Sequence, residues 1–189
     1  MIKKILFVLL LLSSSVQAKE LSGVKLDEQV MAGTETLTLN GAGIRTKFVF
    51  DIYVAAFYTV SPVKKVADLD MQKPMRMAMH FVYDEVSKEK LVDGWNDGFE
   101  DNLSSEQFEK LSSKIKQFNA LFETARAGDV INLDYVPSSG TKVSINQKIK
   151  GKVEGADFYH ALLLIWLGED PVGEDLKDAL LGKTESDNE

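Results

Sequence analysis

The alternation of apolar and polar residues is clearest between positions 44 and 58, where apolar side chains occupy nearly every even position. A period of two predicts a strand with one buried face. The odd face carries Arg45 and Tyr53 beside apolar neighbours, a mixture typical of a strand that borders a pocket. Gly41 and Gly43, just before this segment, predict a hairpin turn that delivers Arg45 to the strand start.

This strand raises a problem of distance between its two polar residues. Eight residues of straight strand would separate Arg45 from Tyr53 by about 26 Å, too far for both to hold one carboxylate. The chain is therefore expected to bend or bulge between them, and Asp51 is the predicted position of the bulge. Otherwise the two side chains would contact opposite ends of a ligand.

The remaining pattern predicts helices that cover a sheet. Ser87 is a predicted helix cap, and the sequence from Ser104 to Gln107 forms a predicted capping box. A nearly all-apolar helix near the end of the chain is the expected floor of the pocket. The further predicted elements are a strand over 75–83, helices over 87–102 and from 104 to Gly128, strands over 129–136 and 141–149, and helices over 157–167 and 174–181.

The order of these elements indicates an α+β fold, with helices gathered on one face of a mainly antiparallel sheet. The length suits one domain, expected over residues 19–182, followed by a polar tail over 183–189 that we expect to be disordered. The chain has no cysteine, so disulfides, thiol chemistry and cysteine-bound metals are excluded.

The first 18 residues have the pattern of a secretory signal peptide. Lys3 and Lys4 precede an apolar run over 5–12, and small residues lead to Ala18. The run is too short to span a membrane. We therefore expect cleavage after Ala18 and export, with a bacterial periplasm as the destination.

The charge of the chain argues against a nucleic-acid partner. The formal charge is −7, and without Lys3 and Lys4 the mature chain has 20 basic against 29 acidic residues, or −9. Nucleic-acid binding surfaces are rich in Lys and Arg, because they neutralise phosphates. The expected partner is a small molecule instead, and the oligomeric state stays open.

Two motifs resemble the chalcone isomerase-like superfamily. The first is G-x-G-x-R from Gly41 to Arg45, followed by an aromatic-rich strand that ends in Y-x-x-x-x-Y at Tyr58. The second is IWLGEDPVGEDLK over 165–177, similar to the family's late helix, glycine and short second helix. The resemblance implies an open-faced β-sandwich with a ligand pocket between the sheet and the helices.

Within this resemblance, an isomerase is one possible function. In chalcone isomerases the arginine after the glycine turn stabilises a phenolate, and Arg45 and Tyr83 match two of the family's polar positions. Tyr53, Lys90 and Ile165, however, stand where the family has threonine, asparagine, and threonine or serine. Most of the hydrogen bonds that orient the substrate are thus expected to be absent, so we expect no appreciable chalcone cyclisation.

Binding of a small amphiphilic acid, such as a fatty acid, is the function that the residues favour. Plant fatty-acid-binding members of the superfamily pair an arginine with a tyrosine in a D-V-Y context, which the sequence from Asp51 to Tyr53 resembles. A guanidinium and a phenol together satisfy a carboxylate, and apolar walls accept its tail. The predicted ligand-binding residues are Arg45, Tyr53, Tyr83, Ile165 and Trp166, with Leu163 also beside the tail.

Haem binding is the remaining alternative, since His160 or His80 could supply an axial ligand. The chain has no C-x-x-C-H motif, so attachment would be noncovalent. His80 is predicted to face away from the methionines of its strand. A lone histidine is more often structural than ligating, and we therefore expect no cofactor.

Overall fold

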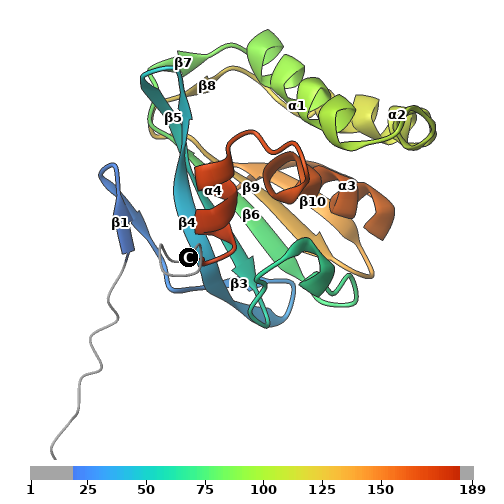
Figure 1. Cartoon of the computed structure of the whole chain (residues 1–189), viewed down its shortest axis with the longest axis horizontal. Coiled ribbons are helices and arrows are strands. Elements are labelled where there is room, and N and C mark those ends of the chain that lie inside the picture. The colour runs from blue at the N-terminus through green and yellow to red at the C-terminus, as the bar shows by residue number, and fades with distance from the viewer. Residues whose placement is uncertain (1–18, 184–189) are drawn as a thin grey trace, which may run out of the picture.

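The computed structural model describes residues 19–183 and contains a seven-stranded, wholly antiparallel sheet (Figure 1). Its strands lie side by side in the order β11-β10-β9-β6-β5-β4-β3. They are β3 (Gln29–Ala32), β4 (Glu35–Lys47), β5 (Phe50–Thr59), β6 (Met75–Phe81), β9 (Val130–Val136), β10 (Gly140–Ile145) and β11 (Lys148–Val153). Two short strand pairs accompany the sheet, β1 (Lys19–Leu21) with β2 (Val24–Leu26), and β7 (Glu85–Val86) with β8 (Ala125–Arg126).

The helices are α1 (Lys88–Asn102), α2 (Ser105–Asn119), α3 (Ala156–Leu167) and α4 (Glu174–Leu180), with a 3-10 turn over Val66–Asp68. The predicted signal peptide and the predicted disordered tail, apart from Lys183, lie outside the described residues. Among residues 19–183, no helix has the length and apolar character needed to cross a membrane.

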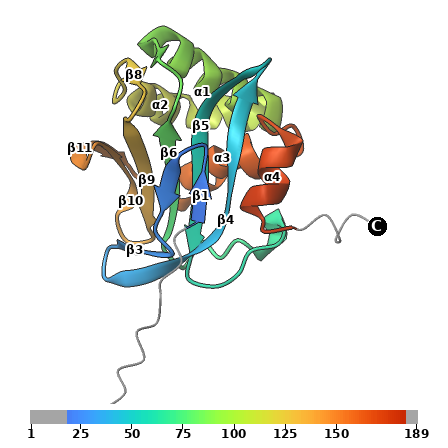
Figure 2. The same ribbon diagram turned by 90° about the vertical axis from the view of Figure 1, so that its left-hand side faces the viewer.

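The sheet has a helical face and a face covered by the β1–β2 hairpin (Figures 1 and 2). Alternation along β5 explains both layers: Ala55 and Phe57 enter the core beneath the helices, whereas Val54 and Ala56 pack with Leu26 on the other side. The predicted α+β class, with helices on one face of an antiparallel sheet, is confirmed.

Helix α3 lies at the centre of the larger core. Its residues are apolar nearly all round, and eight of its twelve residues are buried, so it needs packing partners on every side. Tyr159 stacks on Tyr135 of β9 at 4.7 Å between ring centroids, while Phe158 contacts Phe99 of α1 at 5.9 Å. The sheet and α1 therefore enclose this helix from opposite sides.

Both predicted helix caps are present, but one helix is shorter than predicted. The hydroxyl of Ser87 accepts from the backbone of Lys90, and Ser104 forms a capping box with Gln107. Helix α2 ends at Asn119 rather than near Gly128. The chain after it turns back to pair with β7 as strand β8, and this pairing replaces further helical hydrogen bonds.

The predicted hairpin turn at Gly41 and Gly43 is wrong, because both glycines lie inside β4. They allow α4 to approach the strand closely. A Cβ on Gly41 would lie 2.1 Å from the carbonyl oxygen of Ala179, and one on Gly43 would lie 2.8 Å from the Cβ of the same residue. These glycines therefore serve helix–strand packing rather than a turn.

The true turn is at Phe48 and Val49, where the chain reverses between β4 and β5. Phe48 has a φ of 57°, at the first position of a two-residue loop, where glycine is usual. The single strand predicted over 44–58 is thus two antiparallel strands.

A second predicted strand, over 141–149, is also divided. Asn146 and Gln147 adopt φ values of 50° and 66° and form the turn between β10 and β11. The side chain of Asn146 donates to Asp129 at 2.7 Å and accepts from the backbone of Val130 at 2.9 Å. These side-chain bonds stabilise a tight turn that has no glycine.

We predict that Gly41→Ala will destabilise the fold, since its new methyl group would collide with the backbone of α4. Overpacking of this kind costs about 1–3 kcal/mol, measurable as a lower midpoint in denaturant unfolding. Gly94→Ala is the matched control, because a Cβ on Gly94 meets nothing within 4 Å and the helix gains about 0.5–1 kcal/mol. Wild-type stability in Gly41→Ala would contradict the packing role.

Candidate ligand-binding pocket

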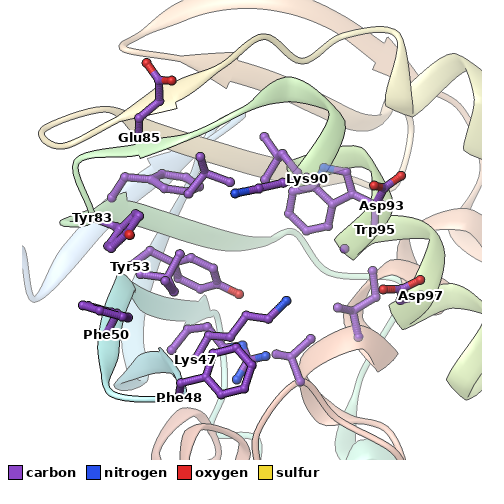
Figure 3. A pocket seen from close by; sticks show the side chains of 18 residues that line it. Lys47, Phe48, Phe50, Tyr53, Tyr83, Glu85, Lys90, Asp93, Trp95 and Asp97 are labelled. Atoms are coloured by element: carbon purple, nitrogen blue, oxygen red, sulfur yellow. The ribbon is translucent and has the colours of Figure 1, made fainter.

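A pocket of about 650 Å³ lies between the β4–β5 hairpin, the end of β6, helix α1 and the end of α3. This volume is within the range of small-molecule sites. The lining residues are Arg45, Lys47, Phe48, Phe50, Ile52, Tyr53, Phe81, Tyr83, Glu85, Val86, Lys90, Leu91, Asp93, Gly94, Trp95, Asp97, Ile165 and Val172. Apolar side chains form most of this lining, and the charged groups come mainly from β4 and α1 (Figure 3).

Arg45 and Tyr53 are direct cross-strand partners in the β4–β5 ladder. The turn at Phe48 folds the chain back, so that paired residues lie about 5 Å apart between their Cα atoms instead of about 26 Å. The bend is therefore a full reversal centred before Asp51, not a bulge at Asp51. A bulge does follow, since Arg45 pairs with Tyr53 and Thr46 pairs with Asp51, leaving Ile52 as the additional residue.

The phenol of Tyr53 is held by a buried hydrogen bond. Trp166 donates its indole N–H to the Tyr53 oxygen at 3.0 Å, and both side chains are almost wholly inaccessible to solvent. Within residues 19–183, the phenol O–H itself has no acceptor. In Figure 3 this hydroxyl points into the pocket. It is thus a donor that the protein orients but does not use.

Burial raises the pKa of Tyr53 to about 12, although the bond from Trp166 and the charge of Arg45 oppose the shift. Desolvation disfavours the phenolate, so the neutral phenol persists throughout the neutral range. Tyr53 therefore acts as a hydrogen-bond donor at neutral pH rather than as a base.

Arg45 is a half-buried residue that lines the pocket, and its guanidinium donates to the carbonyl of Thr46 at 2.6 Å in an exposed position. None of the ion pairs found among residues 19–183 includes Arg45. The positive charge lacks a carboxylate partner in this part of the chain. A guanidinium without a carboxylate partner, on the strand position paired with a phenol, is an arrangement suited to an anionic ligand.

Two more cations, Lys47 and Lys90, extend toward the pocket from opposite walls (Figure 3). The period-two pattern places Lys47 on the same strand face as Arg45, but the predicted ligand-binding residues do not include it. Carboxylates of Asp93 and Asp97 on α1 border the same space. Strand β4 therefore brings only positive groups to the pocket, whereas α1 brings Lys90 together with the two carboxylates.

Aromatic side chains form the apolar walls. Tyr83 contacts Phe50 edge to face at 5.6 Å, and Trp95 contacts Trp166 at 5.7 Å. The Trp95 indole N–H is buried and has no partner among the described residues. Trp95 thus supports Trp166 through ring packing, and Trp166 in turn positions Tyr53.

Of the five predicted ligand-binding residues, four line the pocket: Arg45, Tyr53, Tyr83 and Ile165. Trp166 does not line it, because it lies wholly in the core and reaches the site only through Tyr53. Leu163 is also a core residue away from the pocket. The structure therefore does not place these two side chains at the pocket, and of the residues of α3 only Ile165 lines it.

The positions that differ from the chalcone isomerase pattern meet at the same pocket. Tyr53, Lys90 and Ile165 all line it, although they belong to β5, α1 and α3. Ile165 presents an apolar surface where the chalcone isomerase pattern has the hydroxyl group of threonine or serine. The differences therefore change the chemistry of the pocket itself.

Neither haem candidate reaches this pocket. His80 pairs with Val54 on the sheet face that packs under the β1–β2 hairpin, and burial lowers its pKa while Asp27 opposes this shift. His160 is a half-buried residue of α3 that does not line the pocket. Residues 19–183 contain no cluster of three or more side chains that could hold a metal ion.

Fold and site together define an α+β protein with a small-molecule pocket between an antiparallel sheet and its covering helices. The sequence profile of the chalcone isomerase-like family matches residues 18–182, and the chain belongs to that family. No curated protein matches the chain. A crystal structure of a fatty-acid binding protein from Arabidopsis thaliana is similar, with a TM-score of 0.65, 14% identity, and coverage of 85% of this chain and 92% of that one. The predicted family fold is confirmed.

We predict that Tyr53 will titrate near pH 12, measured as the phenolate absorbance of the wild type minus that of Tyr53→Phe. The folded protein keeps this proton after the unfolded chain loses it near pH 10, so its stabilising effect is complete below pH 10 and is lost as the pH rises toward 12. The subtraction cancels the other tyrosines. A midpoint near 10 in the difference curve would show that the phenol is exposed to water.

Proposed function

We propose that this protein binds a small amphiphilic acid, such as a long-chain fatty acid, without catalysing a reaction. The observation that carries this proposal is the cross-strand pair of Arg45 and Tyr53 at one pocket. One offers an unpaired positive charge and the other an oriented O–H, so a carboxylate there would receive two charge-assisted hydrogen bonds.

The rest of the pocket suits the remainder of such a ligand. Beyond the polar pair, the walls are apolar, from the aromatic residues of the hairpin to Leu91, Ile165 and Val172. An acyl chain along these walls would gain about 25 cal/mol for each Å² of apolar surface removed from water. The similarity to a plant fatty-acid binding protein supports the same ligand class, although the identity of 14% concerns the fold alone.

The chemistry of the site favours binding over isomerisation. A tyrosine whose pKa lies near 12 keeps its proton at neutral pH, so it does not serve as a general base there. Ile165 has no polar atom with which to orient a hydroxylated substrate. The site therefore supplies recognition of a charge and an apolar tail, and Arg45 is its central residue.

We predict that Arg45→Ala will weaken fatty-acid binding at least tenfold, because it removes a charge-assisted contact of about 1.5–3 kcal/mol. Displacement of a fluorescent fatty acid measures the affinity. The melting temperature should change little, since the only hydrogen bond from this guanidinium within the described residues goes to the adjacent carbonyl of Thr46.

Lys148→Ala is the matched control for this experiment. It also removes one positive charge, but Lys148 is exposed on β11, at the opposite end of the sheet from β4. Its affinity should equal that of the wild type. Equal affinity in Arg45→Ala, or a wild type that binds no fatty acid at micromolar concentration, would refute the proposal.

We also propose that the protein works after export, in a periplasm. Support comes from Lys3 and Lys4, the apolar run over 5–12 and the small residues before Lys19. The expected outcome is a mature chain that begins at Lys19, which N-terminal sequencing of the soluble protein from the native host would detect. Recovery of soluble protein that still begins at Met1 would contradict export.

A further inference from the structure

The tip of the β4–β5 hairpin exposes three consecutive large apolar side chains. Phe48 is 90% exposed, Val49 84% and Phe50 52%. Among the described residues, six large hydrophobic side chains are exposed, and half of them lie at this tip. The other three, Met31, Val60 and Ile149, are scattered over different parts of the chain. Single exposed hydrophobic residues are normal on protein surfaces, but a contiguous group indicates an interaction site.

The backbone at the tip is also unfavourable for the residue that occupies it. Phe48 has a φ of 57°, a conformation that glycine and asparagine adopt far more readily than an aromatic residue. Because Phe48 is exposed, packing within the protein does not offset this cost. An aromatic side chain at this position is therefore explained better by a contact outside the protein than by folding.

The tip is continuous with the pocket. Phe48 and Phe50 both line the pocket, and Lys47 follows at the base of the tip (Figure 3). In Figure 2 the end of the β4–β5 hairpin stands beside α1, and Ser22 in the turn of the β1–β2 hairpin bonds to Asp51 just behind the tip. Whatever surface receives the tip therefore also lies against the entrance of the pocket.

Charge near the tip is arranged in layers. Lys47 directly precedes the apolar group in the chain, and Asp51, which directly follows it, accepts hydrogen bonds from Thr46 and Ser22, both at 3.0 Å. The apolar side chains therefore lie at the outermost end of the hairpin, and the Lys47 cation lies behind them. The Asp51 carboxylate accepts hydrogen bonds from two hydroxyl groups of the protein. This order corresponds to the acyl region and the phosphate region of a lipid surface.

We propose that this tip inserts into the surface of a phospholipid bilayer and places the pocket entrance against the lipid. A folded protein partner fits the tip less well, because specific interfaces bury roughly 800 Å² on each side and three side chains offer far less. A bilayer needs no complementary shape. The chain has a formal charge of −7, so zwitterionic lipids are the expected surface rather than anionic ones. Uptake of ligand from the bilayer rests additionally on the proposed function.

The test is co-sedimentation of ligand-free protein with phosphatidylcholine vesicles. Val49→Asp places a charge at the tip without altering a residue that lines the pocket, and it should lower the vesicle partition coefficient at least tenfold. Ile149→Asp is the matched control, since Ile149 is 70% exposed on β11, and its partitioning should equal that of the wild type.

A second variant separates docking from folding. Phe48→Asn should keep or raise the melting temperature, because asparagine tolerates a positive φ, and yet it should reduce vesicle binding. Reduced binding with undiminished stability would support an external role for the aromatic ring. A fall in melting temperature would show that Phe48 serves the fold, and it would overturn the proposal.

The outcomes distinguish this proposal from the proposed function. Fatty-acid binding is measured separately in vesicle-free solution, where Val49→Asp should retain wild-type affinity. If the wild type binds fatty acid but not vesicles, or if Val49→Asp partitions like the wild type, membrane docking fails while the proposed function stands. If vesicles are bound through the tip but no fatty acid is bound, docking stands alone. Self-association in vesicle-free solution that Val49→Asp abolishes would identify a dimer interface instead and overturn docking.

Discussion

The burial of helix α3 is the constraint on which the rest of the structure depends. A helix that is apolar nearly all round loses stability wherever water reaches it, so the sheet must lie beneath it and α1 must close over it. Burial of α3 also removes the indole N–H of Trp166 from water, so this group needs a hydrogen-bond acceptor within the protein. The phenol oxygen of Tyr53 is that acceptor. Core packing and the orientation of a pocket hydroxyl are therefore achieved by the same contact.

The pocket results from the same packing together with the reversal of the chain at Phe48. Helix α1 covers α3, and the β4–β5 hairpin extends past both helices. The space between the hairpin and α1 is the pocket. Because the indole already donates to the phenol oxygen, the phenol proton remains free to point outward. The neighbouring cation then lies on the next strand in direct register. The core thus orients the phenol, and the strand register brings the cation beside it.

Much of the architecture followed from the sequence, where local chemistry decides local structure. The serine caps of α1 and α2 and the apolar helix over 157–167 were predicted, and the strand predicted over 75–83 is present as Met75–Phe81, because caps and periodicity act over a few residues. Two tight turns escaped prediction, at Phe48 and at Asn146. Neither contains the glycine or proline that marks most turns, and at Phe48 the apolar residues continue through the turn.

By itself the sequence determined the family of the fold and part of the pocket lining, since Arg45, Tyr53, Tyr83 and Ile165 were recognisable as candidates. Only the tertiary structure decided how they meet. Gly41 and Gly43 suggested a turn, but their small size serves the approach of α4. Trp166 suggested a ligand contact, but enclosure by the core turned it into a support for Tyr53. Such roles depend on neighbours distant in the chain, and local pattern does not encode which distant residue will approach.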